Sequence, residues 1–177
     1  MANARDVHVD VILESDNPVK FSVEPSPPGS LPMGPNGELI FANDHHPGFH
    51  IHFHLQDPHC LGYRFPKNSD KKEAIWSQLG SGACPSVGKW EVFQPLTVGA
   101  SRMILTVDNP NPKPAQGPFG YTLRVTKDNG ATYLALDPGG VNQNGSQSMN
   151  LSLAAALLGG AAAGSLLTLG AQALLQS

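Results

Sequence analysis

Six of the seven histidines lie within fifteen residues, and their imidazoles are the side chains of this sequence with the clearest potential chemistry. Three of them alternate with apolar residues in the run FHIHFHL, residues 49–55. Because side chains at i and i+2 of a strand project from one face about 6.5–7 Å apart, a strand here would align three imidazoles. The full set of candidate metal ligands is His50, His52, His54, His45, His46 and His59.

Neutral imidazole is a good ligand for Zn²⁺, Cu²⁺ and Ni²⁺, so this row predicts a metal site with Zn²⁺ or Cu²⁺ as the candidate cofactor. A neighbouring strand or the His45–His46 turn would supply the third ligand. Two other interpretations stay open. The cluster could be a surface that titrates near neutral pH, since each imidazolium disfavours the next. It could also be the polar face of an ordinary amphipathic strand.

Cys60 and Cys84 are the only cysteines, and no Cys-x-x-Cys spacing marks a zinc knuckle. A disulfide between them would stabilise the fold by about 3 kcal/mol, whereas a reducing compartment would keep both as thiols. The sequence lacks a Gly-x-Ser-x-Gly elbow, a glycine-rich phosphate loop and His-Glu-x-x-His. We therefore expect a protein that is not an enzyme, with a Cys60–histidine pair as the one nucleophilic alternative.

The first 140 residues predict an all-β domain, an antiparallel β-sandwich whose strand spacing is similar to that of immunoglobulin-like or cupredoxin-like sandwiches. Only KKEAIWSQL, residues 71–79, has helical spacing, and the Asn129-Gly130 pair predicts a hairpin turn. The predicted strands are rich in β-branched and aromatic residues and cover residues 7–13, 20–23, 38–42, 49–55, 90–98, 102–107, 119–126 and 132–136.

The C-terminal end changes character, because residues 138–177 contain no charged side chain and no histidine. We expect a polar linker over 141–150 and an appended apolar helix over 151–177. Residues 151–175 would span about 37 Å as a helix, enough to cross a bilayer core of about 30 Å. Ala156, Gly160, Gly164 and Thr168 recur every four residues and would form a small-residue ridge for close helix packing. Membrane insertion, self-association and packing within the chain all remain open.

The formal net charge of −3 shows no excess of basic residues, which argues against a nucleic-acid partner. The N-terminal MANARDVHVDV has no apolar stretch typical of a secretory signal, so we expect a cytoplasmic protein or one held at a membrane by its tail. The sequence thus favours a non-catalytic binding and assembly protein, whose C-terminal helix mediates homo-oligomerisation or membrane attachment. The alternative is a histidine-dependent Zn²⁺ or Cu²⁺ protein, which could extend to a metalloenzyme.

Overall fold

The computed structural model describes residues 4–34, 38–41, 48–80, 84–111 and 117–142. These residues form strands and a single short 3₁₀ helix, Asn68–Glu73, so the all-β prediction is confirmed. The strands are β1 (Arg5–Asp16), β2 (Val19–Ser26), β3 (Leu39–Phe41), β4 (Phe49–Gln56), β5 (Ile75–Leu79), β6 (Gln94–Val98), β7 (Ile104–Asn109), β8 (Gly117–Val125), β9 (Leu134–Leu136) and β10 (Gly139–Asn142).

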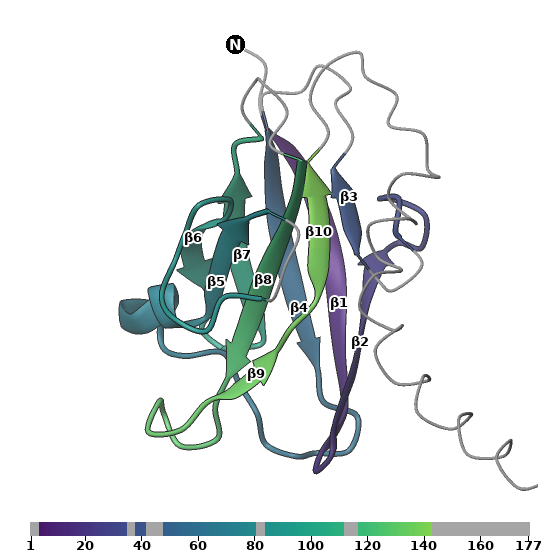
Figure 1. Cartoon of the computed structure of the whole chain (residues 1–177). Helices are drawn as coiled ribbons and strands as arrows, with labels where there is room; N and C mark the ends of the chain where they lie inside the picture. The colour runs from purple at the N-terminus through teal and green to yellow at the C-terminus, as the bar shows by residue number, and fades with distance from the viewer. Residues whose placement is uncertain (1–3, 35–37, 42–47, 81–83, 112–116, 143–177) are drawn as a thin grey trace, which may run out of the picture. The chain divides into compact units, whose positions relative to one another are not determined.

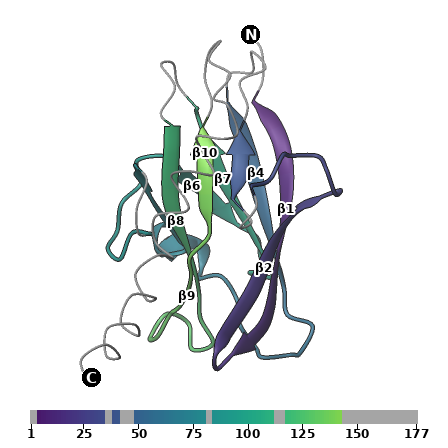
Figure 2. The same cartoon turned by 45° about the vertical axis from the view of Figure 1, so that its right-hand side comes forward.

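The strands form two sheets (Figures 1 and 2). The first has the order β2-β1-β4-β7-β6, and the second has the order β3-β10-β8-β5 with β9 paired to β8. The sheets are mixed, because β1 pairs with β4 in parallel and so does β3 with β10. The expectation of antiparallel pairing therefore holds for the other strand pairs but is wrong for these two. Parallel neighbours need a long connection, and β2, β3 and their loops supply it between β1 and β4.

Side chains from the two sheets form one hydrophobic core, and strands such as β4 and β7 contribute to it by alternation. In β4, Phe49, Ile51, Phe53 and Leu55 are at most 2% exposed, while the residues between them face outward. Rings from the two sheets meet in this core, as in the Phe53–Tyr121 pair with centroids 5.9 Å apart. Burying each such side chain contributes about 1.5–3 kcal/mol, so the core fixes which face of β4 carries the histidines.

Ser77 anchors the segment through which the chain crosses from β5 in the second sheet to β6 in the first. Its backbone amide donates to the Lys89 carbonyl at 2.7 Å, and its own carbonyl accepts from Glu91 at 3.0 Å. Its buried hydroxyl then accepts from the amides of Val92 and Phe93, at 3.2 and 2.8 Å. The backbone bonds form an isolated parallel bridge between Ser77 and Trp90. The hydroxyl then holds the chain at Phe93, whose fully buried ring lies among the core aromatics.

The predicted helix over 71–79 was wrong. The 3₁₀ helix ends at Glu73, and Ile75–Leu79 is strand β5, paired antiparallel with β8. Ile75 and Ser77 point into the core, and the Trp90 indole donates to the Ile75 carbonyl at 2.9 Å. Pairing with β8 outweighs the helical spacing of this short segment, because helix propensity is a weak preference that tertiary contacts override.

The C-terminal predictions fall almost entirely outside the described residues. Strand β10 extends to Asn142 and so includes the first two residues assigned to the linker. The rest of the linker and the predicted helix over 151–177, with Ala156, Gly160, Gly164 and Thr168, lie outside the described ranges. Within those ranges, no helix has the length and apolar character needed to span a bilayer.

Candidate functional site

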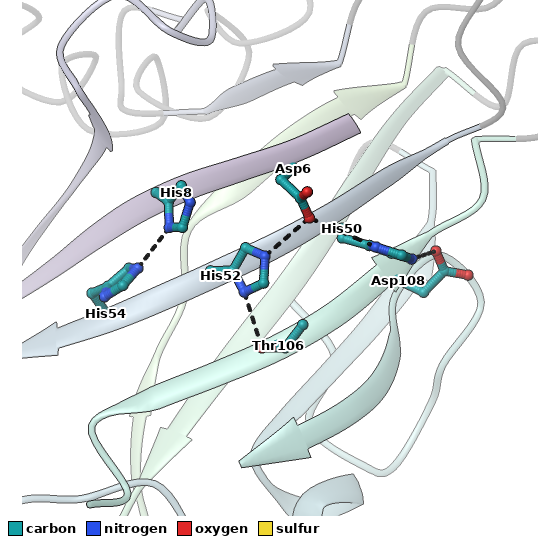
Figure 3. A network of polar contacts seen from close by, with 7 residues as sticks. All are labelled: Asp6, His8, His50, His52, His54, Thr106 and Asp108. Carbon is teal, nitrogen blue, oxygen red and sulfur yellow. Dashed lines mark hydrogen bonds and ion pairs between the residues drawn. The ribbon is translucent and has the colours of Figure 1, made fainter. Parts of the chain in front are cut away.

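The outer face of the first sheet gathers the ionisable residues of β1, β4 and β7 (Figure 3). We call this surface the imidazole–carboxylate face. Alternation along β4 places its three histidines here, each partly exposed, because the residues between them fill the core. The face consists of Asp6, His8, Asp10, His50, His52, His54, Thr106 and Asp108.

The strand register decides which side chains meet on this face. In the parallel β1–β4 pair, Asp6 lies opposite His50, His8 opposite His52 and Asp10 opposite His54. On the other side of β4, the antiparallel register places His50 opposite Asp108 and His52 opposite Thr106. Every histidine of β4 therefore has a polar neighbour on β1, and two of them have one on β7 as well.

His52 has hydrogen-bond partners at both ring nitrogens. Its Nε2 lies 3.2 Å from the Asp6 carboxylate, and its Nδ1 lies 3.1 Å from the Thr106 hydroxyl. A carboxylate only accepts, so Nε2–H donates to Asp6. In the neutral ring, Nδ1 then accepts from the Thr106 hydroxyl. These two bonds fix the ring between β1 and β7. Nε2 carries the proton and the lone pair of Nδ1 accepts from Thr106, so neither nitrogen is free to bind a metal.

His50 lies between two carboxylates. Its Nδ1 is 3.7 Å from Asp6 and its Nε2 is 3.7 Å from Asp108, longer than hydrogen bonds but within ion-pair range. The Asp6 carboxylate is thus shared between His50 and His52. Both nitrogens of His50 face oxygen atoms rather than other imidazoles.

His54 makes its contact with His8, across the β1–β4 pair. His54 Nε2 lies 2.9 Å from His8 Nδ1, and the His8 ring also stacks on His52 with centroids 4.8 Å apart. The pKa of His54 is lowered from its ordinary 6.5, first by burial and then by the positive charge of a protonated His8. Asp10 acts in the opposite direction, and His52 adds to the lowering. His54 therefore favours the neutral form, which is the form that binds metals.

The predicted metal set is not assembled in the described part of the chain. No three histidine, cysteine, aspartate or glutamate side chains among those residues converge as metal ligands would. His50, His52 and His54 share a face, but the first two are directed toward carboxylate and hydroxyl oxygens instead of a common point. His59 is exposed in the turn that follows β4, and His45 and His46 lie outside the described residues.

The two cysteines are free thiols, so the candidate disulfide between Cys60 and Cys84 is not formed in this structure. Cys60 is exposed, at a backbone position with a φ of 53°. Cys84 is half-buried, and its thiol donates to the Pro138 carbonyl at 3.3 Å. Burial, reinforced by the charge of Asp137, raises the pKa of Cys84 to about 11. At neutral pH Cys84 is therefore a poor nucleophile.

Sequence reasoning missed the partners that β1 and β7 contribute to this face. A signal for β1 was available, because Asp6-Val-His-Val-Asp10 alternates in the same way as residues 49–55. Its parallel pairing with β4 could not be deduced from that alternation. The sequence matches neither a protein-family model nor a curated protein.

Proposed function

We propose that this chain is a non-catalytic binding and assembly protein, whose C-terminal segment gathers copies of a β-sandwich body into a homo-oligomer or onto a membrane. The proposal rests on the uncharged run of residues 151–175 with its ridge of small side chains. The body itself supports it indirectly. Its large apolar side chains with more than a third of their surface exposed come from four separate segments of the described chain: Val19, Leu79, Val87 and Leu96. We therefore expect association to depend on the tail more than on these few exposed side chains.

The two sheets around one core support a β-sandwich. Immunoglobulin-like sandwiches are built from antiparallel sheets, so the parallel pairs β1–β4 and β3–β10 weigh against that class. We therefore favour the cupredoxin-like arrangement as a fold, with no function attached to it. The alternative of a Zn²⁺ or Cu²⁺ site on His50, His52 and His54 has less support, because His52 has both nitrogens hydrogen-bonded.

The test compares the mass of the full chain with that of a chain ending at Asn150 and that of the Gly160→Leu/Gly164→Leu variant. Both changes should abolish the oligomer, the first by removing the ridge and the second by blocking close backbone approach. Gly→Leu raises helix propensity by up to about 1 kcal/mol per site, so a lost oligomer would identify the packing surface as the cause. The matched control is Gly159→Leu/Ala163→Leu, which adds bulk at the same spacing on another side of the helix and should keep the oligomer.

Light scattering measures these masses in water or detergent, and vesicle flotation tests the membrane route. If all chains contain the same number of copies per particle, self-association through the tail is wrong. Flotation of the full chain with loss of flotation after truncation would then support membrane attachment. If the full chain neither associates nor floats, the proposed function is wrong.

A further inference from the structure

Two imidazole nitrogens from different strands face each other on the imidazole–carboxylate face. His8 Nδ1 and His54 Nε2 are 2.9 Å apart, and the side chains come from β1 and β4 (Figure 3). We propose that His8 and His54 form a two-imidazole binding site for Cu²⁺. This site is different from the one that the spacing of His50, His52 and His54 predicts, and it does not depend on assembly through the tail.

At the separation of this hydrogen bond, the two nitrogens are nearer to the spacing of neighbouring ligands in a copper site than to that in a tetrahedral zinc site. With metal–nitrogen bonds of about 2.0–2.1 Å, nitrogens 2.9 Å apart subtend about 90° at a shared ion. That is the angle between neighbouring positions of the tetragonal coordination that Cu²⁺ prefers. Tetrahedral Zn²⁺ has angles of about 109° and would need the nitrogens about 3.3 Å apart. Copper also binds nitrogen ligands more tightly than zinc in the general affinity order.

The two rings have the freedom and the surroundings that the site requires. His8 is exposed and His54 is partly exposed, so each ring can turn to direct its lone pair toward an ion beside the nitrogen–nitrogen line. The carboxylate of Asp10, opposite His54 in the register, accepts from the Gln56 amide at 3.3 Å. It adds negative charge close to His54 and is a candidate oxygen ligand, with water completing the coordination.

Besides this turning of the rings, copper binding needs a change of tautomer at the pair. In the hydrogen bond, one of the two facing nitrogens carries the proton and the other accepts it. For both to bind the ion, that proton moves to the far nitrogen of the same ring. Both rings then remain neutral, and no proton is released.

The test is calorimetric titration of the full chain, purified without a histidine tag, with Cu²⁺ at pH 7.5. We expect one equivalent of copper, with Zn²⁺ binding more weakly. His8→Gln and His54→Gln should each lower the copper affinity by about tenfold or more, because each removes one of two protein ligands. Electron paramagnetic resonance of the copper-loaded chain should show nitrogen ligands in the wild type and a changed spectrum in both variants.

His50→Gln is the matched control, because it removes a histidine of the same strand and face whose nitrogens face carboxylates. It should bind copper as the wild type does, and so should His45→Gln/His46→Gln. The proposal is wrong if His8→Gln leaves copper binding unchanged, or if either control abolishes it. Urea unfolding of each variant confirms that it folds. If His54→Gln does not fold, the exposed His8→Gln decides the question. Copper binding and oligomer mass are separate measurements, so either proposal can fail alone.

Discussion

Replacing Ser77 with alanine should destabilise the body by about 2–4 kcal/mol, because one hydroxyl serves two buried amides. The amides of Val92 and Phe93 donate to it at 3.2 and 2.8 Å, and these residues are 2% and 0% exposed. A buried donor left without an acceptor costs about 1–3 kcal/mol. Two such donors would cost at most twice that, and local relaxation recovers part of it. The expected loss is large against a typical domain stability of about 5–15 kcal/mol.

Urea unfolding followed by tryptophan fluorescence measures the loss, and the dependence of stability on urea should stay unchanged because the same surface is exposed. The melting temperature should fall by about 10 °C. The matched control is Ser69→Ala, which removes an exposed hydroxyl bonded to Asp70 and should cost less than about 0.5 kcal/mol. A loss below about 1 kcal/mol for Ser77→Ala, with unchanged urea dependence, would refute the role of this hydroxyl as the crossover anchor.

Three further predictions concern ionisable side chains of the two sheets. His8→Gln should raise the pKa of His54, because it removes the positive charge that disfavours protonation of His54; an NMR titration in which the midpoint stays or falls would contradict this. Since the folded chain lowers that pKa from 6.5, the stability contributed by neutral His54 should be complete above about pH 6.5 and decline as the pH falls further. Arg124→Lys should cost about 1 kcal/mol in urea unfolding, because the guanidinium lies 3.8 Å from the Trp76 ring centroid and 4.0 Å from that of Tyr133. An unchanged stability would show that this stacking contributes little.

The sequence predicted strands well where a strand carries its own alternation. Residues 49–55 and 119–126 have apolar side chains at every second position, and both correspond to strands whose inward side chains are buried. The two strands that it missed lack that pattern. In β5, Ile75 and Leu79 are four residues apart and imitate a helix, although only their pairing with β8 decides the structure. In β10, the glycines at 139 and 140 provide no side-chain pattern, and the strand exists because it lies between β3 and β8.

The candidate site was predictable only within a single strand. The row of His50, His52 and His54 follows from local alternation, and the structure places these residues on one outer face. Which groups they contact depends on neighbours more than forty positions away in the sequence. Instead of converging on a metal, His52 donates a hydrogen bond to Asp6 and accepts one from Thr106. A pattern along one strand therefore indicates which side chains share a face, but it leaves their hydrogen-bond partners undetermined.

The buried side chains alone do not determine the hydrogen-bond partners of these histidines. A strand shifted by two residues still directs the same side chains into the core. Sliding β1 past β4 by one position would expose Val7 and Val9, whereas sliding it by two would keep them buried. A two-residue slide would nevertheless separate Asp6 from His50, whose other nitrogen already faces Asp108 on β7. It would also disturb the stacking of His8 on His52, while β7 continued to hold His52 through Thr106. We infer that the polar contacts of the imidazole–carboxylate face help to select the register that the core leaves open. The position of His8 next to His54 then follows from the same interactions that pair β1 with β4.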